Sequence, residues 1–268
     1  MTEWLADDYH QQSSLQTAMA EEQLAKLTLQ GAERILDVGC GDGKISAAIA
    51  ARVRSGSVLG VDPSRDMIAF AASHFGPSAH ENLRFDVADV RQLPYRHEFD
   101  LVVSFNALHW VPEQVAALGS IHAALKPGGQ ALLRFVPEGQ RKCLEDVIEE
   151  VRSQDRWAGY FRNFQRPYAH FTAQDYRALA EQCGFSVVRL DVEDKAWDFK
   201  TRPAFEAFAR ATFAEWTQHL PASEWPAFIS EVLDRYQSVA ANQPSELNTF
   251  KFYQLEIVLA PLADPSER

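Results

Sequence analysis

The sequence predicts an α/β fold in which a mainly parallel sheet carries helices on both faces. Between residue 15 and about residue 136, short β-branched or apolar runs alternate with segments of helical period. The runs are almost continuously apolar, as strands buried on both faces are. A glycine-rich turn at residues 39–43 directly follows the first run and precedes a helical segment. These features together indicate strand–helix–strand units in one sheet.

The elements follow in order along the chain. Residues 14–29 have apolar side chains spaced for one face of a helix. Ser64, directly behind Pro63, is placed to cap the second helix that follows a strand. A turn at residues 126–129 (KPGG) separates the last of these helices from the fifth strand. Strands are expected at 34–39, 57–62, 83–89, 99–107 and 130–137, and helices at 44–53, 64–75 and 112–125.

The second half of the chain has a different pattern. Residues 138–182 and 203–240 are expected to be mainly helical, with strands at 185–199 and 250–261. Of the Phe, Trp and Tyr residues, which number 17, 6 and 7, twenty lie from Trp157 onward. Part of this excess is ordinary helix core. The remainder predicts an aromatic-rich helical cap that lines an apolar pocket.

Composition and charge exclude several classes of function. The formal net charge is −11, which argues against nucleic acid or an anionic membrane as the main partner, because both attract basic surfaces. No run approaches the roughly 18 apolar residues that span a bilayer, and the N-terminus lacks the pattern of a secretion signal. The three cysteines are far apart, with no spacing typical of a disulfide framework or a zinc site. A soluble cytoplasmic protein acting on small molecules, or on proteins, fits these features.

Three ligands use glycine turns like DVGCGDGK. A phosphate-binding P-loop needs Ser or Thr after its lysine, but Ile45 follows Lys44. A dinucleotide fingerprint needs a small residue at its sixth position, where this chain has Lys44. The third pattern, an acidic residue before GxGxG, binds S-adenosylmethionine. Gly39 and Gly41 would let the backbone approach the ligand, and Asp37 would accept from its ammonium group, directly or through water.

Later features agree with the third pattern. Asp62 ends the second strand, where a carboxylate can accept from both ribose hydroxyls, and Asp89 ends the third, where it can accept from an adenine amino group. Each acidic residue alone is most simply a cap or a solvated turn. The turn at 125–129 (LKPGG) follows at the place usual for this pattern.

With these motifs, residues 30–136 resemble class I S-adenosylmethionine-dependent methyltransferases. The resemblance implies a Rossmann-like seven-stranded sheet whose last strand is antiparallel. The segments 9–16 (YHQQSSLQ) and 106–111 (NALHWV) resemble a narrower group, the juvenile hormone acid and trans-aconitate methyltransferases. By this resemblance, residues 1–29 form a helical lid, 30–137 the cofactor-binding core, and 138–268 the rest of the sheet with an inserted cap.

The same resemblance implies roles for particular residues. Gln16 and Trp110 would hold an acceptor carboxylate through neutral amide and indole N–H donors. Tyr9 and the segment 104–108 would close over the cofactor. The expected cofactor-binding set is Tyr9, Asp37, Gly39, Gly41, Asp62, Pro63, Met67, Asp89, Val90 and Asn106, with no metal.

The function expected from these features is methylation of an apolar carboxylic acid to its methyl ester. A carboxylic acid with a pKa of roughly 4 is already ionised at neutral pH, so no general base is needed. One alternative is methylation of carbon, nitrogen or a phenol on a bulky metabolite, with His109 or a cap residue as base. Another is a cofactor-binding regulatory protein without chemistry. The expected partner is a small-molecule acceptor, and the chain is expected to be a monomer or homodimer.

Overall fold

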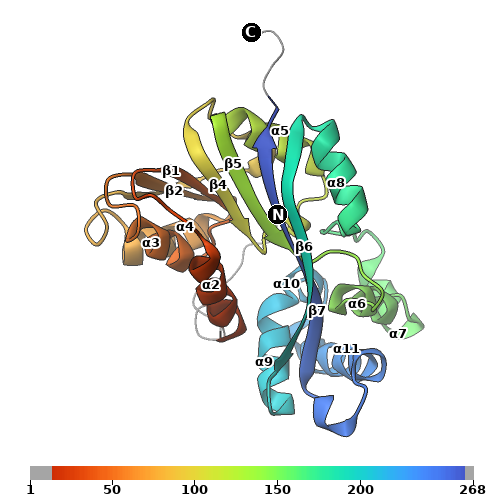
Figure 1. The fold of residues 1–268 in the computed structure, drawn as a ribbon. Helices are drawn as coiled ribbons and strands as arrows, with labels where there is room; N and C mark the ends of the chain where they lie inside the picture. Colours follow the sequence, from red (N-terminus) through yellow and green to blue (C-terminus); the bar gives the residue numbers. More distant parts are fainter. Residues whose placement is uncertain (1–13, 263–268) are drawn as a thin grey trace.

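A computed structural model describes residues 14–262, which form a seven-stranded sheet with the order β3-β2-β1-β4-β5-β7-β6 (Figure 1). β1 pairs in parallel with both β2 and β4, whereas β7 runs antiparallel to both of its neighbours. This arrangement confirms the predicted fold class. The strands are β1 (Arg34–Val38), β2 (Ser57–Asp62), β3 (Leu83–Val87), β4 (Phe99–Phe105), β5 (Leu125–Phe135), β6 (Phe185–Asp198) and β7 (Thr249–Pro261).

Helices cover both faces of the sheet, because the central strands are apolar on both sides. Ile35 and Leu36, neighbours on β1, are both fully buried and belong to different core clusters, one on each face. One face is covered by α2 (Ser14–Lys26), α3 (Lys44–Ala50) and α4 (Arg65–Phe75). The other is covered by α5 (Gln114–Ala124) and α8 (Ala173–Gln182).

The remaining helices form a cap around the far ends of β6 and β7 (Figure 1). They are α6 (Leu144–Arg152), α7 (Asp155–Ala158), α9 (Arg202–Thr212), α10 (Ala214–Thr217) and α11 (Trp225–Ala240). β7 continues from the sheet into this cap, where Phe250 and Phe252 join its aromatic core. The cap and the sheet are therefore connected through continuous strands.

The cap differs in one respect from the sequence expectation. Residues 162–172, within the segment expected to be mainly helical, contain no regular helix. Pro167 restricts the residue before it to extended backbone, and Thr172 caps the start of α8 by accepting from the Asp175 N–H. The segment bonds to the core instead, since Ala169 N–H donates to the His109 carbonyl at 2.8 Å. This brings residues 165–170 beside the end of β4.

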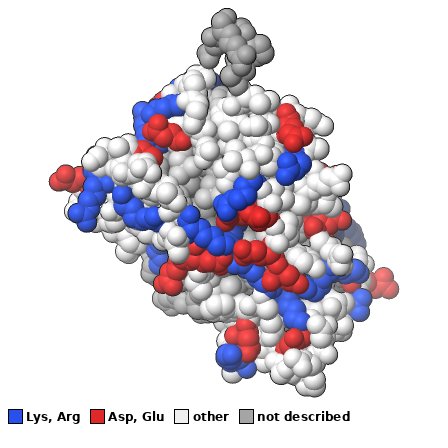
Figure 2. All heavy atoms as spheres, in the orientation of Figure 1, with Lys and Arg blue, Asp and Glu red and all other residues white. Residues whose placement is uncertain are grey.

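Charged side chains on the surface are interleaved rather than separated by sign. On the face shown in Figure 2, Lys and Arg lie in a band among Asp and Glu. Ion pairs form between such neighbours, as between Arg141 in the loop after β5 and Asp194 of β6. Among the described residues, no helix is both long and apolar enough to cross a bilayer.

Candidate active site

The turn after β1 requires glycine at its first position. Gly39 has φ +73°, and a Cβ built there would lie 2.2 Å from the Cβ of Ala107, which follows β4. Its N–H donates to the Val61 carbonyl at 2.8 Å. Gly41 also has positive φ, but nothing lies within 4 Å of its added Cβ. The turn is thus packed tightly on the β4 side and open at Gly41.

Asp62 connects this turn with the start of α4. Its carboxylate accepts from Gly41 N–H at 3.1 Å and from Ser64 N–H at 2.9 Å. Ser64 in turn caps α4 by accepting from Met67 N–H. Burial raises the pKa of Asp62, although the two backbone hydrogen bonds oppose that shift. Each oxygen keeps a lone pair for a ligand hydroxyl.

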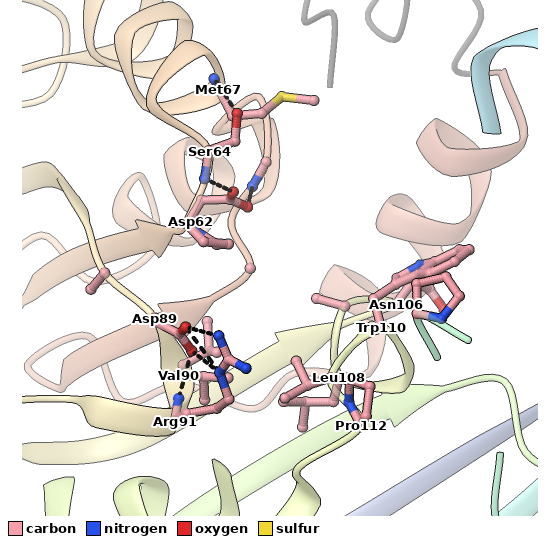
Figure 3. Close-up of a pocket in the computed structure, with 18 of the residues that line it drawn as sticks. Asp62, Ser64, Met67, Asp89, Val90, Arg91, Asn106, Leu108, Trp110 and Pro112 are labelled. Atoms are coloured by element: carbon pink, nitrogen blue, oxygen red, sulfur yellow. Dashed lines mark hydrogen bonds and ion pairs between the residues drawn. The ribbon is translucent and has the colours of Figure 1, made fainter. Parts of the chain in front are cut away.

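Asp89, just beyond β3, lies on the same wall as Asp62 (Figure 3). It accepts from the backbone N–H of Arg91 at 2.9 Å and from the guanidinium of the same residue. Hydrogen bonding from Arg91 lowers the pKa of Asp89 more than burial raises it. Asp89 is therefore a fixed, ionised acceptor.

The segment after β4 forms the opposite wall, with Asn106, Leu108, Trp110 and Pro112 facing Asp62 and Asp89 (Figure 3). Asn106 has φ +58°, and its side-chain oxygen accepts from Gln254 at 3.0 Å. Such left-handed backbone at a non-glycine residue is uncommon and is held by its surroundings.

A buried amide holds the short helix at Leu108–Trp110 in place. The Gln114 amide donates to the carbonyls of Leu108 and Val111, and its oxygen accepts from the Tyr176 hydroxyl at 3.0 Å. This support could not be predicted from the sequence, because Tyr176 is 62 positions away.

These walls enclose a cavity of about 720 Å³. Nine of the predicted site residues line it, namely Gly39, Gly41, Asp62, Pro63, Met67, Asp89, Val90, Asn106 and Trp110. Further lining residues that the sequence did not indicate include Arg65, Arg91, Glu113, Gln165, Arg166, Pro167 and Glu215.

Three predicted residues are not among the lining. Tyr9 lies outside the described residues, and Gln16 is in α2, where its side chain is not described. Asp37 is buried behind the glycine turn, 2% exposed, and accepts from the Ser46 hydroxyl at 2.6 Å. Burial, aided by the nearby Asp62 charge, raises the pKa of Asp37 to about 7.

Helix α2 packs beside Trp110, which belongs to the cavity wall formed by the segment after β4. Leu15 is buried in the cap core, and Met19 and Trp110 pack against the same cluster. One helical turn further on, Glu22 pairs at 3.2 Å with Arg134, whose side chain is 1% exposed. This pairing gives Arg134 a structural partner, and Arg134 is not part of the cavity lining.

The aromatic residues of the cap pack mainly against one another. Trp157 stacks edge-on to Phe228 at 5.1 Å, and Phe199 stacks on Phe205 at 4.9 Å. The cap residues that reach the cavity are Gln165, Arg166, Pro167 and Glu215. The expectation that aromatic cap residues line the pocket is therefore wrong for the described residues, because helical spacing does not reveal which face meets a ligand.

His109 is poorly placed to act as a base. It is 5% exposed and is not part of the cavity lining. Burial, with a smaller effect from His170, lowers its pKa to about 3. Such a group is neutral but too weak to remove a proton from a phenol or amine.

Comparisons with known proteins agree with this geometry. Residues 35–129 match the family model described as "Methyltransferase domain". A putative methyltransferase of Invertebrate iridescent virus 6 is 28% identical, covering 88% of this chain and 86% of that protein. Juvenile hormone acid O-methyltransferase of Drosophila melanogaster is 26% identical, covering 86% and 80%. Trans-aconitate 2-methyltransferase of Enterobacter sp. (strain 638) is 28% identical, covering 91% and 90%.

Solved structures share the fold. A putative methyltransferase from Bacillus halodurans has a TM-score of 0.63 at 20% identity, covering 94% of this chain and all of that one. A phosphoethanolamine N-methyltransferase of Haemonchus contortus, in complex with S-adenosyl-L-methionine, has a TM-score of 0.61 at 17% identity, covering 96% and 56%.

The sheet order is that of methyltransferase folds, and carboxylates at the strand ends surround a glycine turn, as in sites that bind a nucleoside. The matched methyltransferase domain, these relatives and the shared fold together support a class I S-adenosylmethionine-dependent methyltransferase. Its cofactor is S-adenosyl-L-methionine.

Proposed function

We propose that the protein transfers a methyl group to the carboxylate of an apolar small-molecule acid and forms its methyl ester. The observation that carries this proposal is the position of Trp110, which faces the carboxylates of Asp62 and Asp89 across one cavity. Two relatives are named for acids, juvenile hormone acid and trans-aconitate. A carboxylate also needs no base, which suits a site where His109 is buried and weakly basic.

We assign the cofactor end of the cavity to the strand-end residues. Asp62 would accept from the ribose hydroxyls and Asp89 from the adenine amino group, with Met67 and Val90 as apolar walls. Gly39 and Gly41 would admit the backbone close to the methionyl part. Asp37, buried behind them, would act on the ammonium group through water. The bound cofactor supplies an electrophilic methyl group on a sulfonium.

We assign the acceptor end to Trp110 and Gln16. The start of α2 packs into the same core cluster as Trp110, which supports a shared role. Neutral N–H donors would orient the carboxylate without reducing its nucleophilicity as a cation would. The acceptor's apolar body would lie along Phe105, Leu108 and Pro112, because the cap side chains in the cavity are mostly polar.

The alternative reaction, on carbon, nitrogen or a phenol, needs a base. Glu113 and Glu215 are carboxylates in the cavity lining that could take a proton. This alternative predicts activity that rises or peaks with pH. Carboxylate methylation predicts a flat profile above roughly pH 6.

The test uses methyl-tritiated S-adenosylmethionine with two acceptor pools, apolar carboxylic acids and non-acidic phenols, amines and prenyl compounds. Mild alkali then releases label from methyl esters as volatile methanol. We expect alkali-labile product from the acid pool alone, lost in Gln16→Ala and retained in the control Gln30→Ala at an exposed position. Alkali-stable product from the second pool would refute the carboxylate proposal. Cofactor binding with no turnover of either pool would favour a regulatory protein.

Three expectations stay predictions: the three-part division of the chain, its monomeric or homodimeric state, and its cytoplasmic location.

A further inference from the structure

Three buried polar atoms near Trp110 have no hydrogen-bond partner within residues 14–262. They are the Tyr168 hydroxyl, Nε2 of His170 and Nδ1 of His109. Buried polar groups without partners are rare, and each costs free energy unless something binds it. Three such groups in one neighbourhood therefore point to a ligand.

The three side chains form one contiguous group. The rings of Tyr168 and His170 are 4.7 Å apart, centre to centre, and those of His109 and His170 are 6.1 Å apart. The hydrogen bond from Ala169 N–H to the His109 carbonyl holds the two segments side by side. The group is built from the cap segment and from the end of β4 together.

Trp110 separates this group from the cavity. It lines the cavity, and its ring also meets Tyr168 edge-on at 6.1 Å and His109 at 5.2 Å. Arg166 and Pro167, which precede Tyr168 in the chain, also line the cavity. An acceptor held at Trp110 would reach the group by parting the Trp110 and Tyr168 rings.

The group is neutral. Burial lowers the pKa of both histidines and raises the pKa of Tyr168. Cys143 Sγ lies 3.4 Å from Nδ1 of His170, and burial raises the pKa of this thiol, so both partners of this hydrogen bond are uncharged. Nε2 of His170 is a donor in one tautomer of the neutral ring and an acceptor in the other, so it can bond to a hydroxyl or, as a donor, to a carbonyl.

The surroundings disfavour an anion here. The charges of Glu145 and Asp146 act on His170, and those of Glu145 and Glu149 act on Tyr168. The guanidinium of Arg166 lies over the Tyr168 ring, but this guanidinium is paired with Asp146. A buried second carboxylate would meet these acids without a free cation to compensate it.

We propose that Tyr168, His170 and His109 form a specificity subsite for an uncharged oxygen, a hydroxyl or carbonyl, that the acceptor carries close to its reacting carboxylate. This inference rests on the proposed function and deepens it. The oxygen would lie close to the carboxylate because Trp110, to which we assign the carboxylate, also contacts Tyr168 and His109. The subsite selects the acceptor and takes no part in the transfer itself.

The test compares three acids of equal chain length with the full-length protein and tritiated S-adenosylmethionine. They are dodecanoic, 3-hydroxydodecanoic and 12-hydroxydodecanoic acid. We expect kcat/KM for the 3-hydroxy acid to exceed that of the other two by about tenfold, the value of one or two neutral hydrogen bonds. Tyr168→Phe should reduce this preference to about threefold or less. Tyr160→Phe, which removes a hydroxyl from an exposed ring, should leave it unchanged.

The opposite results are equally distinct. Equal kcat/KM for the three acids, preference for the 12-hydroxy acid, or an unchanged preference in Tyr168→Phe would each overturn the subsite. If Tyr168→Phe does not fold, the wild-type ratios decide alone. Methylation of none of the acids would overturn the proposed function as well. Loss of the preference after dialysis against EDTA would replace the subsite with a metal site at Cys143, Glu145 and His170, whose ligand-type atoms lie within 4.8 Å of one another.

Discussion

Replacing Gly39 with alanine tests whether the cavity depends on the close approach of two loops. The new Cβ would lie 2.2 Å from the Cβ of Ala107, whereas carbon atoms pack at about 3.5–4.0 Å. Relieving this overlap costs about 1–3 kcal/mol, and a non-glycine residue at φ +73° adds about 1–2 kcal/mol. We expect Gly39→Ala to lower the free energy of unfolding by about 2–5 kcal/mol.

Two further variants separate these contributions. Gly41→Ala also places a side chain at positive φ but meets no atom within 4 Å, so it should cost only about 1–2 kcal/mol. In the double variant Gly39→Ala/Ala107→Gly, the nearest remaining atom is the Cα of residue 107 at 3.7 Å, which is ordinary contact. The second change should therefore recover about 1–3 kcal/mol.

Urea unfolding of the wild type and the variants measures these free energies. Calorimetric titration measures the affinity of the cavity for S-adenosylhomocysteine. This affinity should fall in Gly39→Ala and return in the double variant. A double variant no more stable than Gly39→Ala would refute the steric argument. So would equal damage from Gly39→Ala and Gly41→Ala.

Three other predictions concern carboxylates. Because the folded-state pKa of Asp37 is raised to about 7, its ionisation lowers the stability of the fold as pH rises from about 4 to about 7. Asp37→Asn should therefore raise the free energy of unfolding at pH 8 by up to about 4 kcal/mol. The same variant should bind S-adenosylhomocysteine more weakly. Equal stability at pH 8 would contradict this. Asp62→Asn should weaken cofactor binding about 10- to 100-fold by titration calorimetry, because it loses charge-assisted hydrogen bonds, whereas the exposed Asp66→Asn should not; equal effects would refute the role. Burial opposes ionisation of Glu22, but hydrogen bonds from two lysines and the charge of Arg134 outweigh burial and lower the pKa of Glu22 to about 2. Glu22→Gln should therefore lower the free energy of unfolding in urea by about 1 kcal/mol at pH 7, and this difference should vanish as pH falls from about 4.5 toward 2. An unchanged free energy of unfolding at pH 7 would contradict the prediction.

The predictable part of the site follows from strand order. Asp62 is the last residue of β2, and Asp89 and Asn106 follow the ends of β3 and β4. The strands β3, β2, β1 and β4 lie side by side and parallel. Their carboxyl ends meet at one edge, so residues found only by their position after an apolar run come together in space. The apolar runs themselves were recognisable because both faces of the strands are buried.

Other parts depend on contacts that spacing along the chain does not encode. Gln114 has the sequence position of an ordinary first-turn residue of a helix, but it is 3% exposed. Its amide N–H donates to the Leu108 carbonyl, and its amide oxygen accepts from the Tyr176 hydroxyl. Asp37 precedes the glycine turn as the motif requires, yet its side chain turns to Ser46 of α3. The backbone N–H of Ala169 likewise donates to a carbonyl far back in the sequence, that of His109.

The way the cap joins the sheet affects how this enzyme can change its acceptor. Helices α9, α10 and α11 leave β6 and return to β7 at a paired position, where Asp198 is opposite Thr249 and Phe199 N–H donates to the Asn248 carbonyl at 3.0 Å. Because entry and exit are neighbours on one ladder, this stretch can be lengthened, shortened or exchanged without moving the register of the strands. The segment 162–172 is different, since its backbone is bonded to the wall of the cavity. Recombination between relatives should therefore keep the strand register when it exchanges α9–α11 together with α6 and α7, which pack on them in one core, while new acceptor preferences should arise by point substitution around Tyr168.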